Sequence, residues 1–388
     1  MYEATEKQQK LACGQYVLAV LAALLQGAAV PPLPAGLTWP QVYALAKAHA
    51  LECMVLAGVE PQLQAEPELL AAWRRRRDLD TVQTLTQISE QQRVLAAFSQ
   101  AGIPVLRVKG SALRALYPRP EYRQMSDIDL VVRAENADRA CALLRTLGYQ
   151  QKPTKHPEQK DAEFALPPYM GLEVHTNLLA PHEKRAAYYQ QQDIWAKARQ
   201  EPGLPGVYCL RPEDEYLYQL AHFLKHYESA GIGLRQVLDL YLCWQAWGSR
   251  MDAAYLGREC EKMQITTART TMEQLAQYCF GKPAARPSAA VLHMQQECIL
   301  SGVYGTAELW RQREIEAAQH TGQKGWKLRY FCQRLFPPVE YLRVRYPRLH
   351  RCPWLYPFYW LCRLLDFGSW KKNFRTEIAQ LKNADRRG

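Results

Sequence analysis

The pattern of hydrophobic and polar residues predicts helical regions on either side of a short strand-rich region. In residues 1 to 98 apolar side chains recur at helical spacing, and Trp39, Val42, Ala46 and His49 fall on one face of a predicted helix. Between residues 101 and 180 short apolar runs alternate with turn residues, which is typical of strands. The helical spacing returns from Ala186 onward.

The strand-rich region can be divided further. "IPVLRVKGSALRALYP" predicts a short strand, a Gly-Ser turn and an amphipathic helix that ends at Tyr117. "DIDLVV" predicts a buried strand, and "NADRACALLRTLGY" predicts a helix closed by Gly148. "EFAL" and "GLEVHTNL" flank a Pro-Pro-Tyr-Met-Gly turn, as the two strands of a hairpin do.

These elements predict an α+β protein, with a small mixed β-sheet and helices packed on it. The length of 388 residues allows two or three compact units. We expect the following regions: a helical region at 1–98, the sheet core at 99–180, a second helical region at 181–320 and a C-terminal segment at 321–388.

Composition indicates the cellular compartment and shows that the C-terminal segment is strongly basic. Eleven cysteines occur with no Cys-x-x-Cys pair, so a zinc site or disulfide framework is not expected and a reducing cytoplasm fits best. The apolar stretch from Tyr16 to Val30 is too short for a membrane span, and we expect a core helix and no transmembrane segment. Residues 321–388 hold 15 Lys or Arg and 4 Asp or Glu, so they carry the whole net charge of +11.

The sequence "MSDIDLVV" places two acids at the start of a predicted strand. Because side chains alternate along a strand, Asp127 and Asp129 project from the same face. Two neighbouring carboxylates repel each other unless a cation lies between them. Glu173 in "GLEVHTNL" offers a third acid on a strand that we expect to be adjacent, and three oxygen ligands suit Mg²⁺.

A turn before these acids predicts a contact with phosphate. "VKGSAL" delivers Lys109, Gly110 and Ser111 where a strand passes into a helix. The first N–H groups of a helix have no helical partner and point toward an approaching anion. We expect this turn to hold the phosphates of a nucleotide beside the acids, although an ordinary strand-to-helix turn would have the same sequence.

These motifs resemble a known family. "GIPVLRVKGSALRALYPRPEYRQMSDIDLVV", then "LGY" and "GLEVHTNL", are similar to the uncharacterised nucleotidyltransferases of the polymerase-beta-like nucleotidyltransferase superfamily. "PEDEYLYQLAHFLKHYESAGIGLRQVLDLY" resembles the helical segment of that family. The resemblance implies a nucleotidyltransferase core at 99–180, and a helical domain at 181–320 that covers substrate and nucleotide.

The resemblance also implies roles for individual residues. Asp127, Asp129 and Glu173 would be catalytic and would bind two Mg²⁺ ions, with Mn²⁺ as a substitute. Nucleotide contacts are expected from the following residues: Lys109, Gly110, Ser111, Arg123, Lys225, His226 and Arg235. His175, His222 and Asp239 are expected in a second shell. Structural alternatives stay open for Arg123 as a surface arginine, for His175 as a structural histidine, and for the helical residues as a solvated face with an Arg235–Asp239 ion pair.

The expected reaction is transfer of a nucleoside monophosphate, with ATP favoured as the donor, to an acceptor that the sequence does not identify. One alternative is a nucleotide- or RNA-binding regulator of the same fold without activity. Another is a toxin-like modifier of tRNA or protein. Arginines and aromatic residues alternate in segment 321–388, which could pack on the core, bind tRNA or contact an anionic surface.

Overall fold

The fold is that of a computed structural model, which describes residues 2–153, 161–181, 183–282, 286–303, 305–320, 342, 346–350 and 352–365. The chain divides into two compact units. The first unit contains residues 1–227 and 231–305, and the second contains residues 228–230 and 306–388. Across the described residues, no helix combines the length and the apolar character needed to cross a membrane.

The first unit begins with four helices, as its periodicity predicts. Their bounds are α1 (Tyr2–Gln26), α2 (Trp39–Ala48), α3 (Glu52–Val59) and α4 (Pro67–Gln100). Helix α2 starts with a capping box, in which the Gln41 side chain accepts a hydrogen bond from the Thr38 backbone N–H at 2.9 Å. Pro67 opens α4, where its fixed φ angle suits the first helical turn.

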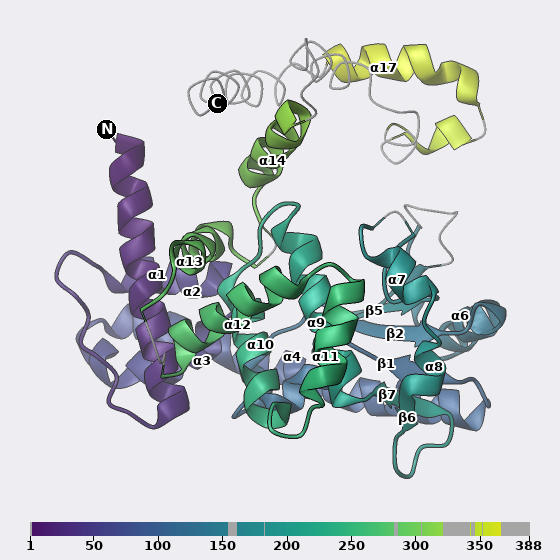
Figure 1. Cartoon of the computed structure of the whole chain (residues 1–388), viewed down its shortest axis with the longest axis horizontal. Helices are drawn as coiled ribbons and strands as arrows, with labels where there is room; N and C mark the ends of the chain where they lie inside the picture. Colours follow the sequence, from purple (N-terminus) through teal and green to yellow (C-terminus); the bar gives the residue numbers. More distant parts are fainter. Residues whose placement is uncertain are drawn as a thin grey trace. The chain divides into compact units, whose positions relative to one another are not determined.

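A seven-stranded mixed sheet follows, which confirms the predicted α+β class (Figure 1). The strand order is β3-β4-β5-β2-β1-β7-β6. The strands are β1 (Val105–Arg107), β2 (Ile128–Val132), β3 (Gln150–Gln151), β4 (Ala162–Leu166), β5 (Met170–His175), β6 (Ala198–Gln200) and β7 (Val207–Leu210). The predicted hairpin is the antiparallel pair β4–β5, and β5 also pairs with β2 in parallel.

Two expectations about these elements were wrong. The prediction that the chain is helical from Ala186 onward misses β6 and β7, which pair with each other and extend the sheet beside β1. Strands of three and four residues are too short to show a period, so the pairing with β1 decides their structure. The helix after the Gly-Ser turn is shorter than predicted: α5 (Gly110–Leu113) passes into a single 3₁₀ turn at Arg114–Leu116.

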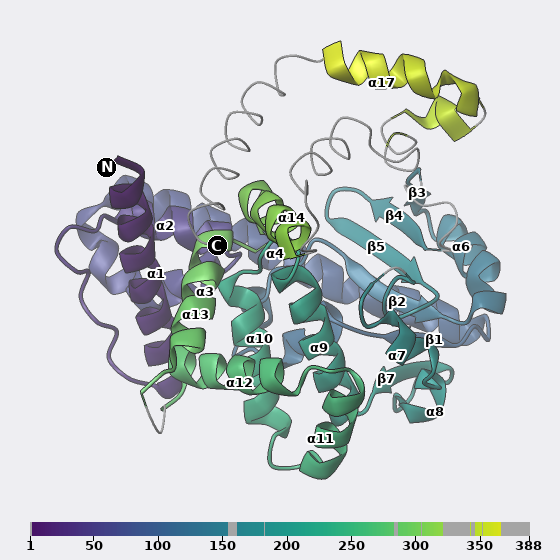
Figure 2. The ribbon, with the colours of Figure 1, turned by 45° about the horizontal axis from the view of Figure 1, so that its top comes forward.

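Helices cover both faces of the sheet. Helices α4 and α6 (Ala137–Thr146) pack on one face, where Ile128, Leu130 and Val174 point into a core shared with Phe98. Leu106 and Val131 on the other face share a core with residues of α9 (Pro212–Tyr227) and α10 (Leu234–Trp247), which are drawn beside the strands in Figure 2. The face toward α4 and α6 is therefore mainly apolar, while the other face carries Asp129, Glu173 and His175.

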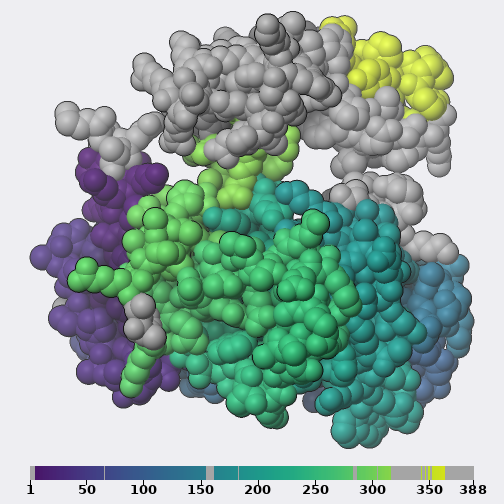
Figure 3. Space-filling view, in the orientation of Figure 1, coloured from purple at the N-terminus to yellow at the C-terminus, as the bar shows by residue number. Residues whose placement is uncertain are grey.

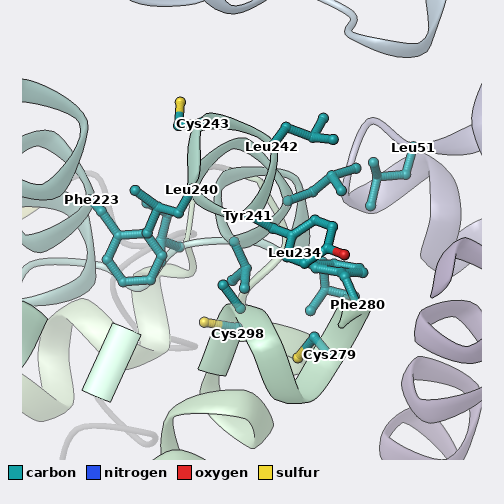
Figure 4. Close-up of a cluster of buried hydrophobic side chains, with 14 of the residues drawn as sticks. Leu51, Phe223, Leu234, Leu240, Tyr241, Leu242, Cys243, Cys279, Phe280 and Cys298 are labelled. Atoms are coloured by element: carbon teal, nitrogen blue, oxygen red, sulfur yellow. The ribbon is translucent and has the colours of Figure 1, made fainter. Parts of the chain in front are cut away.

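The remaining helices of the first unit build a second core. They are α7 (Ala186–Gln190), α8 (Ile194–Lys197), α11 (Ala253–Lys262), α12 (Thr266–Phe280) and α13 (Ala289–Ser301). Figure 4 shows part of this core, in which Tyr241 of α10 lies 5.7 Å from Phe280 of α12 between ring centroids. Helix α1 packs against α12 and α13, so the purple and green surfaces are continuous in Figure 3.

The described part of the second unit is mainly helical. Its helices are α14 (Ala307–His320) and α17 (Tyr356–Leu365), and the ring of Tyr346 stacks on that of Tyr359 with 4.5 Å between centroids. Most of the basic segment 321–388 lies outside the described residues. The predicted tRNA or anionic-surface contact falls on this segment and stays a prediction.

Candidate active site

The sheet brings the second and third predicted acids side by side. In the parallel β2–β5 pair Asp129 is in register with Glu173. Along β5, Leu172 and Val174 are buried in the apolar core, so Glu173 and His175 project from the opposite face. Strand alternation therefore places two carboxylates and an imidazole on one side of the sheet.

His175 lies among three carboxylates. Its Nε2 atom is 3.1 Å from Asp129 Oδ1 and 3.2 Å from Glu173 Oε2, while its Nδ1 atom is 3.2 Å from Asp161 Oδ2. Burial alone would lower the pKa of His175, but these contacts raise it to about 10. The imidazole is thus protonated at neutral pH, and its positive charge balances part of the acidic cluster.

Asp127 lies immediately before β2, at the same edge of the sheet. The Ser126 hydroxyl donates a hydrogen bond to Asp127 Oδ1 at 3.2 Å. A Cβ atom added to Gly171 of β5 would lie 2.7 Å from the Ser126 carbonyl oxygen and 3.2 Å from Asp127 Cβ. Glycine at position 171 therefore allows Asp127 to approach the strand that carries Glu173.

The electrostatics of this cluster favour a cation. Burial, together with the charges of Asp129 and Glu173, raises the pKa of Asp127 to about 6. Burial would also raise the pKa of Asp129, but Lys109 and His175 hold it below its usual value. A carboxylate whose pKa is raised by its acidic neighbours is ionised more readily when a metal ion is bound beside it.

The donor atoms are close enough to share one ion. One atom each of Asp129, Glu173 and His175 lie within 4.8 Å of one another, although His175 could bind an ion only after losing the proton that its raised pKa favours. Two of the three are carboxylates, which suit Mg²⁺ and Mn²⁺. Asp127 is not in this compact group, and His175, expected only in a second shell, is part of it.

Lys109 points from the predicted phosphate turn into the acids. Its Nζ atom forms a short ion pair with Asp129 Oδ1. Burial opposes the charge of this ammonium group, but Tyr218 and Asp129 outweigh the effect and keep its pKa above the ordinary value. The backbone of Lys109 has a φ of 55°, which is uncommon for a residue other than glycine and turns the chain sharply into α5.

The rest of the phosphate turn is tightly packed. A Cβ atom on Gly110 would lie 2.4 Å from Arg123 Nη1 and 2.9 Å from the Met125 sulfur, so only glycine fits there. The Ser111 hydroxyl donates to the Val108 carbonyl oxygen at 3.1 Å and is buried. Close packing behind the turn fixes its position beside the acids.

Arg123 and Arg235 were expected to bind the nucleotide, but in the structure they bind other groups of the protein. Arg123 is buried and forms a two-pronged ion pair with Asp239, at 2.8 Å from Nε to Oδ1 and 2.9 Å from Nη2 to Oδ2. The Tyr117 hydroxyl donates to the same carboxylate at 2.8 Å. Arg235 donates from Nη1 to the Gln124 carbonyl oxygen at 2.7 Å. Asp239, expected to pair with Arg235, thus binds Arg123.

The predicted helical residues lie along α9. The Nε2 atoms of His222 and His226 are 3.2 Å apart, and Lys225 forms an ion pair with Glu183 at 2.7 Å. Burial lowers the pKa of both histidines, and nearby lysines lower it further, so both are neutral at pH 7. The charges of Lys109 and Asp129 act on His222, which therefore lies near the acidic cluster.

Asp161, which contacts His175, was not among the predicted site residues. Counting back along the β4–β5 hairpin would have found it. Ala162 pairs with Val174, so the residue before Ala162 lies beside His175. The hairpin register was the available signal.

The fold and this cluster define the class of protein. The mixed sheet presents an Asp-x-Asp motif next to a third acid on the adjacent strand, which is the arrangement that the resemblance to nucleotidyltransferases implies. The family model for uncharacterised nucleotidyltransferases matches residues 35–281, which is more than half of the chain. The chain therefore belongs to this family and is a nucleotidyltransferase.

Two solved structures of an antibiotic-resistance factor are similar to the chain. The solution structure of ANT(2'')-Ia is 14% identical, with a TM-score of 0.34, and the match covers 50% of this chain and 97% of that one. The crystal structure of ANT(2'')-Ia in complex with adenylyl-2''-tobramycin is 16% identical, with a TM-score of 0.34 and coverage of 48% and 99%. Comparison with curated proteins yields no match.

Proposed function

We propose that the protein transfers a nucleoside monophosphate, preferentially AMP, from a nucleoside triphosphate to a hydroxyl group of its acceptor. The observation that carries this proposal is the register of β2 and β5, which sets Asp129 beside Glu173 with Asp127 at the adjoining strand end. Two Mg²⁺ ions, for which Mn²⁺ can substitute, would neutralise the phosphates and make the acceptor hydroxyl more acidic. Asp127, Asp129 and Glu173 would hold them, with His175 beside the shared position.

The protein's residues supply orientation and proton transfer. In the proposed reaction the acceptor oxygen attacks the α-phosphorus, and the bond from that phosphorus to the β-phosphate oxygen breaks, releasing pyrophosphate. Glu173 takes the proton of the acceptor hydroxyl, because its side chain is 31% exposed while that of Asp129 is 10% exposed. Such catalysis rests mainly on positioning and on charge neutralisation.

The phosphate turn would receive the β- and γ-phosphates. The backbone N–H groups of Gly110 and Ser111 begin α5, and Lys109 supplies a cation that now pairs with Asp129. We propose that Lys109 moves from this carboxylate to the phosphates when the nucleotide binds. Arg123 and Arg235 are held by protein groups, so we propose that they support the turn and its neighbouring loop. Lys225 and His226 remain proposed contacts on the α9 side.

A labelling experiment tests the reaction. The protein is incubated with each α-labelled nucleoside triphosphate, Mg²⁺ and a cell extract, and label on any acceptor is measured. We expect transfer with the wild type and none with the Asp127→Asn/Asp129→Asn variant. Equal labelling by the two proteins would refute the proposal. Loss of the label with RNase or with protease would identify the acceptor as RNA or protein.

A further inference from the structure

A buried glutamine on α4 connects the separate parts of the site. Gln87 is 1% exposed, although α4 packs on the face of the sheet opposite the acids. Its Nε2 atom donates to the Met125 carbonyl oxygen at 3.0 Å and to the Tyr169 carbonyl oxygen at 3.3 Å. Its Oε1 atom accepts a hydrogen bond from Arg114 Nη2 at 2.6 Å. One side chain therefore binds three segments that are distant in sequence.

Each of these segments carries a different part of the site. Met125 lies two residues before Asp127, in the loop that leads to the first acid. Tyr169 is in the hairpin turn immediately before β5, which carries Glu173. Arg114 directly follows α5, the short helix that begins at the phosphate turn. We propose that Gln87 is a positioning residue, which sets the separation of the first acid, the third acid and the phosphate turn.

The loop before Asp127 shows the same arrangement along its backbone. The backbone carbonyl oxygens of residues 123, 124 and 125 each accept a hydrogen bond from a side chain. The donors are Arg114 to the Arg123 oxygen at 3.4 Å, Arg235 to the Gln124 oxygen at 2.7 Å, and Gln87 to the Met125 oxygen. Gln83 makes a further contact of 3.2 Å with the Met125 carbonyl. An irregular loop held at consecutive carbonyls has little freedom to move Asp127.

The energetic reason is that these groups are shielded from water. A buried carbonyl or guanidinium group that loses its partner must recover a hydrogen bond, and the segment that carries it moves to do so. Metal and phosphate sites tolerate displacements of only about 0.5 Å. Loss of Gln87 would therefore change the geometry of the site without removing any of its ligands.

This inference rests on the proposed metal-dependent function, and direct metal binding tests it. Gln87→Met keeps the size of the side chain and removes all three hydrogen bonds. We expect the affinity for Mn²⁺, measured by calorimetric titration of the whole protein, to fall about 10-fold, which is typical for loss of a group that orients metal ligands. Leu70→Ala is the control, because Leu70 is buried on α4 and belongs to the other core, so its loss should lower stability and leave Mn²⁺ affinity unchanged.

Gln83→Met gives a second measurement if Gln87→Met does not fold. Gln83 is half-buried and shares only the Met125 contact, so we expect a loss of Mn²⁺ affinity that is smaller than the roughly 10-fold loss expected for Gln87→Met. If the folded Gln87 and Gln83 variants bind Mn²⁺ as tightly as the wild type, the positioning role is refuted while the proposed function stands. If the wild type binds Mn²⁺ no better than the Asp127→Asn/Asp129→Asn variant, the metal site fails and both proposals fail with it.

Discussion

His49 makes the stability of this protein depend on pH, by an amount that the structure allows us to predict. Its imidazole is fully buried where the end of α2 meets the start of α10 and the end of α13. The Leu234 backbone N–H donates to Nδ1 at 3.2 Å, and Nε2 lies 3.1 Å from the Ile299 carbonyl oxygen. This pair of partners requires the neutral ring, with its single proton on Nε2. A second proton, on Nδ1, would face the Leu234 N–H.

The expected magnitude follows from proton linkage. Burial, together with the charges of Lys10 and Arg235, lowers the pKa of His49 from 6.5 to about 4, against the opposing effect of the Ile299 hydrogen bond. The unfolded chain takes up the proton near pH 6.5, while the folded chain resists it until about pH 4. Stability is therefore complete above pH 6.5 and is lost as the pH falls through this window. One proton over this range corresponds to about 3 kcal/mol of unfolding free energy.

Urea unfolding at pH 7.5 and pH 4 measures this loss. We expect His49→Gln to lose about 3 kcal/mol less than the wild type between the two pH values, because glutamine can bond to both partners and does not titrate. His293→Gln is the matched control, since His293 is 71% exposed and should leave the pH dependence unchanged. If wild type and His49→Gln lose the same free energy, His49 does not titrate as argued.

Two further substitutions test the site. Gly171→Ala should lower the rate of label transfer 10- to 100-fold, because the added methyl group displaces Asp127. Gly257→Ala is the control and should keep full activity, because its methyl group meets open space. Full activity in the Gly171 variant would contradict this. Arg123→Met should reduce the free energy of unfolding by 3–5 kcal/mol in urea titrations, because Asp239 is left charged and buried, and adding Asp239→Asn should restore part of the loss. If the single and double variants have the same free energy of unfolding, the buried charge of Asp239 is not the cause.

The positions of the predicted acids follow from local pattern, and their partners do not. Strand alternation predicts that Asp127 and Asp129 share a face, whereas β2 begins at Ile128 and includes only Asp129. The pairing of Glu173 with Asp129 depends on the β2–β5 register, which joins strands more than 40 residues apart. His175 could be placed on the same face as Glu173, but its contacts with three carboxylates depend on three strands meeting.

Arg123 and Gln87 show more clearly what could not be predicted from the sequence. Arg123 stands in a polar loop, where an arginine is equally suited to a phosphate or to a buried acid, and only the packing of α10 supplies Asp239. Gln87 lies in an ordinary helical stretch with no motif around it, and its partners are 27, 38 and 82 residues away. The spacing of neighbouring residues does not predict contacts between such distant positions.

Residue types and their spacing were sufficient for the α+β class and for the helical N-terminal region, and they are the basis of the roles proposed for the acids and the Gly-Ser turn. These features are set by interactions between near neighbours, because a period of 2 or 3.6 residues decides which face a side chain occupies. The membership of β6 and β7 in the sheet, the buried Arg123–Asp239 pair and the role of α4 behind the acids came only from tertiary structure. Each depends on burial and pairing between distant segments, which exist only once the chain has folded.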